Sequence, residues 1–105
     1  MNFAERAKES AVKENMHLFQ IAMEDYAITF AGTYPGPGEE AALLNLMPNA
    51  SAPLNPFTKN PTNLVWNGDP GTQGQISITN LAGGGYLIKG YGANGILTSA
   101  IQLGD

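Results

Sequence analysis

The residues able to do acid–base or metal chemistry are few and widely spaced in this sequence. His17 is the only histidine, and cysteine is absent. Adjacent carboxylates occur at Glu24-Asp25 and Glu39-Glu40, but neighbouring residues on a helix point in different directions and cannot converge on one substrate atom. No metal-ligand or nucleophile–base spacing surrounds His17. We therefore expect a protein that is not an enzyme, with no catalytic residue, no cofactor and no metal site.

Aromatic side chains are the remaining candidates for recognition. Four of them are candidate contacts with a ligand or with another subunit: Tyr34, Phe57, Trp66 and Tyr91. Their rings offer a large apolar face, and Tyr and Trp add a polar edge. Trp66 and Tyr91 are the candidates for a ligand site, while at least half of the aromatic side chains outside the helix are expected to pack inside the protein.

Composition limits the classes of function. The chain has 105 residues, enough for one domain over residues 1–105, with 43% hydrophobic residues to form its core. Charged residues make up 13%, against about 25% in an average protein, and the net charge is −4. Because no Lys or Arg cluster provides a phosphate-binding footprint, we do not expect nucleic-acid binding. No apolar run reaches the roughly 18 residues of a membrane span, so this chain by itself is expected to be soluble.

One long amphipathic helix is predicted from Ala4 towards Pro35. Steps of four and three residues place its apolar side chains on one side: Val12, Met16, Phe19, Met23, Tyr26 and Phe30. We expect the helix to end near Ala31, because Gly32 can take the left-handed closing conformation and Pro35 prevents continuation. The apolar side requires a partner surface.

The first three turns of this helix differ from the rest. Their charged and small residues include no bulky apolar face: Ala4, Glu5, Arg6, Ala7, Lys8, Glu9, Ser10, Ala11 and Lys13. A helical segment that neither packs nor caps is marginal in water and tends to fray. We interpret this half as the remaining part of a longer helix that is truncated at its N-terminus.

The middle of the chain is rich in proline. Residues 34–38 form a stiff connector, and a short second helix is predicted over residues 39–47, stopped by Pro48. Residues 49–74 have little periodicity, so we expect an ordered loop or a few short extended pieces. Its apolar residues should hold it to the body of the protein: Leu54, Phe57, Leu64, Val65 and Trp66.

The C-terminal third has the alternating pattern of strands. Three strands are predicted over residues 75–81, 86–90 and 96–103, separated by the glycine-rich links 82–85 and 92–95. Asn94-Gly95 is a strong hairpin signal, because both residues accept positive φ. Strands joined by such short links form an antiparallel meander, and one face of it can receive the helix. The predicted fold class is α+β, with a long N-terminal helix on a three- to four-stranded antiparallel sheet.

Several segments, taken in order, resemble the globular part of bacterial type IV pilin-like proteins, which include pilus subunits and the major pseudopilins of type II secretion. The segments are residues 7–16 and 20–27 of the helix, Gly32-Thr33-Tyr34-Pro35, Asn55-Pro56-Phe57-Thr58, Asp69-Pro70-Gly71 and Gly90-Tyr91-Gly92-Ala93-Asn94-Gly95. Each is weak alone, whereas their order and spacing are fairly specific and cover nearly the whole chain.

The resemblance implies a pilin-like fold and a structural role. Family members begin with a leader cleaved by a prepilin peptidase, followed by an apolar helical half that anchors the precursor in the inner membrane. Those apolar helices then form the core of an extracellular filament, and loops of the heads contact neighbouring subunits. Here these loops would be residues 35–49 and 55–70. The implied partners are copies of the chain itself and the pilus or secretion assembly machinery.

Two alternatives to a pilus subunit remain open. Major pseudopilins typically carry a calcium site in a Gly-Ala-Asp-Gly-like segment and the acidic loop after it. In this sequence Gly92-Ala93-Asn94-Gly95 is followed by no carboxylate until Asp105, so a pilus subunit is favoured over a pseudopilin. The second alternative is a soluble adhesion or binding module that uses the proline-rich loop.

Overall fold

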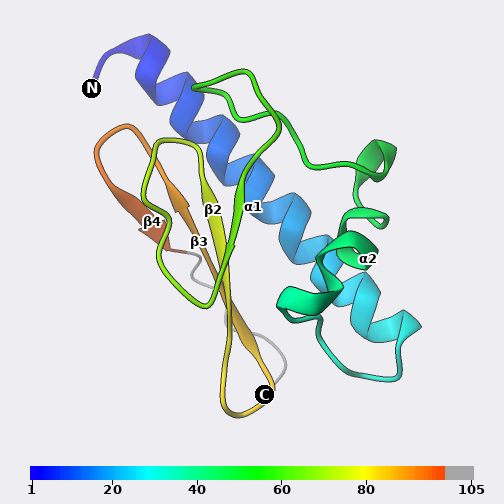
Figure 1. Cartoon of the computed structure of the whole chain (residues 1–105). Coiled ribbons are helices and arrows are strands. Elements are labelled where there is room, and N and C mark those ends of the chain that lie inside the picture. Colours follow the sequence, from blue (N-terminus) through cyan, green and yellow to red (C-terminus); the bar gives the residue numbers. More distant parts are fainter. Residues whose placement is uncertain (99–105) are drawn as a thin grey trace.

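The computed structural model describes residues 1–98, which form a long helix packed across a four-stranded sheet (Figure 1). Helix α1 spans Phe3–Thr29 and is followed by the 3₁₀ turn η1 (Pro37–Glu39), helix α2 (Glu40–Leu44) and a second 3₁₀ turn, η2 (Pro48–Ala50). The strands are β1 (Leu64–Trp66), β2 (Ile76–Asn80), β3 (Tyr86–Tyr91) and β4 (Ile96–Thr98). The α+β fold class predicted from the sequence is confirmed.

The sheet combines the predicted meander with a parallel edge strand. Its spatial order is β1-β2-β3-β4, in which β2, β3 and β4 pair antiparallel. The register places Ile78 beside Ile88 and Tyr91 beside Ile96. Strand β1 joins β2 in parallel, with Trp66 beside Ile78, and the sequence did not predict this pairing. The part of the third predicted strand after Thr98 lies outside the described residues.

The core lies between α1, α2 and one face of the sheet. Eleven buried apolar side chains form it: Val12, Met16, Phe19, Ala22, Met23, Leu43, Met47, Ile76, Ile78, Tyr86 and Ile88. In β3 the buried residues alternate with half-buried ones, as expected of a strand that turns one face to a helix. The predicted inner side of α1 is therefore confirmed at five of its six positions, since Tyr26 is also buried.

Phe30, the sixth position, was predicted wrongly. Its side chain is 47% exposed, because α1 ends at Thr29 and Phe30 has already left helical geometry, with φ −115° and ψ 41°. The chain then turns through two left-handed residues, Ala31 (φ 63°) and Gly32 (φ 87°). The amide of Gly32 donates to the carbonyl oxygen of Ala27 at 2.7 Å, so the closing role predicted for Gly32 is confirmed.

The N-terminal end of α1 is better fixed than expected. Asn2 and Glu5 form a capping box: the Glu5 amide donates to Oδ1 of Asn2 at 2.8 Å, and the Asn2 amide donates to Oε1 of Glu5 at 3.1 Å. Further along, Lys8 lies over the ring of Phe57, with Nζ 5.6 Å from the ring centroid. The expectation that this half neither packs nor caps is therefore wrong, because single polar residues replace the missing apolar face.

The second helix is shorter than predicted. Helix α2 covers only Glu40–Leu44. Two i to i+3 bonds follow, from the Leu46 amide to the Leu43 carbonyl oxygen and from the Met47 amide to that of Leu44, each 3.0 Å. Tightening of this kind is common where a helix meets a proline. Leu43 and Met47 are nevertheless buried, so the segment contributes to the core as expected.

The proline-rich segment is ordered around one buried side chain, Asn55. Its Nδ2 donates to the Gln73 carbonyl oxygen at 3.0 Å, and its Oδ1 accepts from the amides of Phe57 (2.8 Å) and Thr58 (3.3 Å). The prediction that Leu54 holds this loop to the body is wrong, because Leu54 is 61% exposed. Phe57, Leu64 and Trp66 do pack against the core, as predicted, and Asn55 adds a polar hub, since a buried amide can satisfy several backbone groups at once.

Candidate interaction surface

The four aromatic candidates do not converge on one site. Tyr91 follows Gly90, whose missing side chain faces Met16 and Val12 of α1. Successive residues of a strand face opposite sides of the sheet, so Tyr91 faces away from the helix. Trp66 is on the helix side, beside Ile78. The ligand site expected around Trp66 and Tyr91 is therefore not assembled.

Trp66 and Phe57 each have a partner within the protein. The indole Nε1 of Trp66 donates to Oε1 of Glu40 at 2.9 Å, which connects β1 to α2. The ring of Phe57 lies under the ammonium group of Lys8. Both side chains are half-buried. Their main contribution in the isolated chain is to hold the proline-rich segment and α2 in place.

Tyr34 belongs to a polar cluster centred on Glu24. Its hydroxyl donates to Oε1 of Glu24 at 3.3 Å, and the hydroxyl of Tyr86 donates to Oε2 at 2.6 Å. The two rings meet edge to face, with centroids 4.8 Å apart. Burial, and after it the hydrogen bond to the Glu24 carboxylate, raises the pKa of Tyr86 well above its usual value. The cluster joins α1, the segment after it and β3.

A second carboxylate of α1 anchors the opposite end of the sheet. Oε2 of Glu9 accepts from the Ala93 amide at 3.2 Å, and the neighbouring Gly92 leaves no space for a side chain beside the Glu9 carboxylate. Glu9 and Glu24 thus bind the turn after β3 and the start of β3, respectively. Both carboxylates are structural anchors between helix and sheet.

Among residues 1–98, the outer side of α1 keeps large apolar side chains exposed. Six residues, here called the outer stripe, follow one another in steps of seven, four, three, four and seven: Phe3, Ser10, Glu14, His17, Ile21 and Ile28. These steps keep all six on one side of a helix. Its three large apolar members are exposed, Phe3 by 80%, Ile21 by 52% and Ile28 by 82%.

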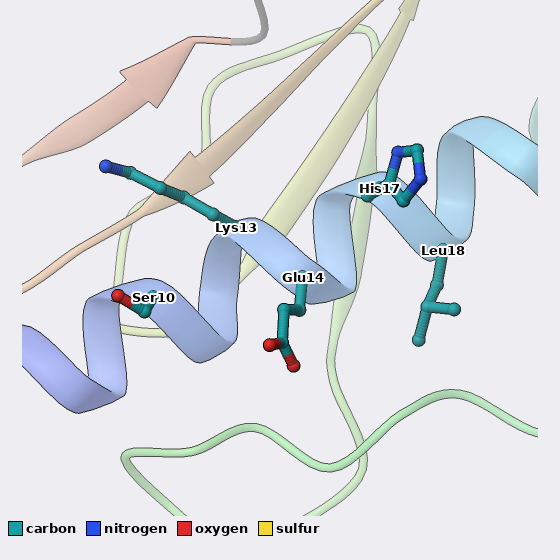
Figure 2. Close-up of a pocket in the computed structure, with 5 residues that line it drawn as sticks. All are labelled: Ser10, Lys13, Glu14, His17 and Leu18. Carbon is teal, nitrogen blue, oxygen red and sulfur yellow. The ribbon is translucent and has the colours of Figure 1, made fainter.

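The middle of the outer stripe is hollowed. Within residues 1–98, five side chains line a hollow of about 600 Å³: Ser10, Lys13, Glu14, His17 and Leu18. Figure 2 shows Lys13 and His17 extending from one side of the helix and Glu14 and Leu18 from the other, with the short Ser10 one turn away. His17 is exposed. Among residues 1–98 no group of three or more His, Cys, Asp or Glu side chains is placed to hold a metal ion.

The outer stripe could have been found from the sequence. Its apolar residues Phe3, Ile21 and Ile28 are separated by 18 and seven residues, and 18 residues make five complete turns. The signal was missed because the inner side of the same helix contains a denser apolar series, which by itself accounted for the amphipathic pattern.

Comparisons with known proteins add no identity. No family model, no curated protein and no solved structure matches this chain. In the part of the chain that the structure describes, no helix combines the length and apolar character needed to cross a membrane. The outer stripe and the arrangement of α1 on the sheet are therefore the observations from which a function must be argued.

Proposed function

We propose that this chain is the globular head of a structural subunit in an extracellular, type IV pilus-like filament. In this proposal an apolar helix continues α1 in the N-terminal direction, anchors the precursor in the inner membrane and later packs inside the filament. The partners are copies of the same chain and the machinery that assembles them. No catalytic step is assigned to the head.

The observation that carries the proposal is the relation of α1 to its sheet. Helix α1 has 27 residues, about 40 Å at 1.5 Å per residue, and its first turns extend beyond the strands (Figure 1). Only its inner side is used by the core, while Phe3, Ile21 and Ile28 remain exposed on the outer side. A repeated assembly needs such a surface on each copy, because heterologous contacts must recur along an axis.

The exposed residues favour a filament subunit over an adhesion module. Most of the large exposed apolar side chains lie on α1 or at its two ends. In addition to the apolar members of the outer stripe, they include Met1 and Phe30. Two of the four aromatic candidates, Tyr34 and Trp66, instead hydrogen-bond to carboxylates of the same chain. A binding module would be expected to direct its aromatic rings into a shared groove.

Immunogold electron microscopy of the native organism tests the proposal. Antibodies raised against residues 1–105 should decorate thin filaments at the cell surface, and the coding region before Asn2 should specify a short leader and about 20 apolar residues. A gene that provides no such segment, together with label confined to dispersed protein, would contradict the filament. Calcium-independent folding of the head would in addition separate a pilus subunit from a pseudopilin.

A further inference from the structure

The outer stripe is symmetric about its own midpoint. That midpoint falls between Asn15 and Met16, and the six residues form three pairs equidistant from it: Glu14 with His17, Ser10 with Ile21, and Phe3 with Ile28. When this face is turned end over end, its six positions coincide again, with Glu14 exchanged for His17, Ser10 for Ile21 and Phe3 for Ile28. Such self-complementarity is what a two-fold contact between identical chains requires.

The chemistry of the pairs suits an antiparallel alignment. In that alignment Glu14 lies opposite the partner's His17, which places an acceptor against a donor on both sides of the axis. Ser10 lies opposite the partner's Ile21, so a short side chain leaves room for a branched one. Phe3 lies opposite the partner's Ile28, and both are exposed in the single chain.

A parallel alignment in register lacks these matches. It would place Glu14 against the partner's Glu14, a like-charge contact that disfavours association. It would also place Ser10 against the partner's Ser10, and two short side chains would leave the space beside the hollow unfilled. Close packing between two elements is favoured when large and small residues alternate across facing positions.

The hollow described above marks the centre of the antiparallel contact. Glu14 and His17, the two residues next to the midpoint, both line it, and so does Ser10. Its remaining lining residues, Lys13 and Leu18, flank the outer stripe on opposite sides (Figure 2). The Ile21 side chain of a second copy has the apolar character and the position to enter this hollow.

We propose that two copies of this chain associate through the outer stripe of α1 as an antiparallel, two-fold symmetric pair. This inference does not depend on the filament role, because it concerns the 105-residue chain alone. A closed pair leaves no part of the outer stripe for a third copy, so pairing and filament growth through this surface exclude each other.

Sedimentation equilibrium over a range of protein concentrations tests the association. The 11.1 kDa chain should approach twice that mass as concentration rises. Ile21→Glu should weaken the association by at least about tenfold, as expected for a central contact residue. Ile96→Glu is the matched control, because Ile96 is 45% exposed but lies on β4, and it should leave the dissociation constant unchanged.

Single cysteines test the orientation, since the chain has none of its own. Ala4→Cys and Asp25→Cys flank the outer stripe at opposite ends of α1. In the antiparallel pair a short bis-maleimide should join the two variants only when they are mixed, because the two copies of Ala4→Cys would lie about 35 Å apart and those of Asp25→Cys about 28 Å. A parallel pair would instead cross-link each variant to itself.

Three results would overturn the proposal. A single mass of 11.1 kDa at every concentration up to about 1 mM would show that the outer stripe is not self-associating. Equal weakening by Ile21→Glu and Ile96→Glu would place the contact on another surface. Self-cross-linking of Ala4→Cys in the absence of Asp25→Cys would show a parallel arrangement. Far-ultraviolet circular dichroism of each variant verifies that its fold is retained.

Discussion

The inner side of α1 has an apolar residue at nearly every position of its helical repeat, whereas the outer side has polar residues at several of them. On the inner side Val12, Phe19 and Met23 have no exposed surface, whereas Phe3 and Ile28 on the outer side are 80% and 82% exposed. Both sides follow the helical repeat, but Ser10, Glu14 and His17 interrupt the outer series. A continuous apolar series is suited to permanent burial, and an interrupted one to a surface that must be stable both in water and against a partner.

The comparison also shows how a helix is fixed in rotation about its own axis. The inner side is held by apolar contact along its length and by carboxylates near both ends: Glu9 accepts from the Ala93 amide, and Glu24 accepts from Tyr34 and Tyr86. Hydrogen bonds to charged groups are stronger than those between neutral groups. Once these anchors are formed, the outer stripe can only face solvent or another molecule.

The largest expected effect comes from truncating the inner side. Phe19→Ala should lower the free energy of unfolding by about 3–5 kcal/mol, because a fully buried ring is replaced by a cavity. Ile21→Ala on the outer side should change it by less than about 0.5 kcal/mol. Urea unfolding at about 1 μM measures both values, once sedimentation has shown that the chain is monomeric at that concentration.

Similar losses in the two variants would remove the distinction between the two sides. A large loss for Ile21→Ala at 1 μM would mean that the outer side is already covered within the single chain. The same measurement at high concentration should separate wild type from Ile21→Ala again, because association stabilises the folded state by mass action.

Features that depend on residues close together in the sequence could be predicted, and features that depend on distant segments could not. The repeat from Val12 to Tyr26 and the Asn94-Gly95 hairpin signal depend on neighbouring positions, so the helix and the meander were predicted correctly. The parallel pairing of β1 and the role of Asn55 depend on contacts between distant segments, which no local pattern encodes. The link from Glu24 to Tyr86 spans 62 residues and was missed for the same reason.

A smaller loss of stability is expected from a substitution at the point where the inner side of α1 lies close to the sheet. A β-carbon at Gly90 would lie 2.8 Å from Sδ of Met16 and 2.9 Å from Cγ1 of Val12. Gly90→Ala should therefore force α1 away from β3 and destabilise the fold by about 1–3 kcal/mol. Gly83→Ala is the control, since nothing lies within 4 Å of the added atom.

Thermal denaturation of the two glycine variants gives the comparison directly. If Gly90→Ala is as stable as Gly83→Ala, the flexible Met16 side chain has moved aside and the close approach of α1 to β3 is not a determinant of packing. If it is less stable, the distance between helix and sheet is set at this position, and the outer stripe is oriented by it.

The smallest effect concerns the polar anchor of the inner side and depends on pH. Tyr86→Phe removes the 2.6 Å hydrogen bond to Glu24 and should cost about 1–2 kcal/mol at pH 7. The pKa of Tyr86 is raised in the folded state, so the stability it contributes is complete below its unfolded value of about 10 and decreases as pH rises above it. Urea unfolding between pH 7 and pH 11.5 should show a constant difference in the free energy of unfolding between wild type and Tyr86→Phe up to about pH 10, and a decreasing difference at higher pH.

A difference in the free energy of unfolding that stays constant over the whole range would mean that the Tyr86 hydroxyl ionises as easily in the folded chain as in the unfolded one. The start of β3 would then be held to α1 by apolar contact, and at this end the difference between the inner side and the outer stripe would lie in burial and not in charge.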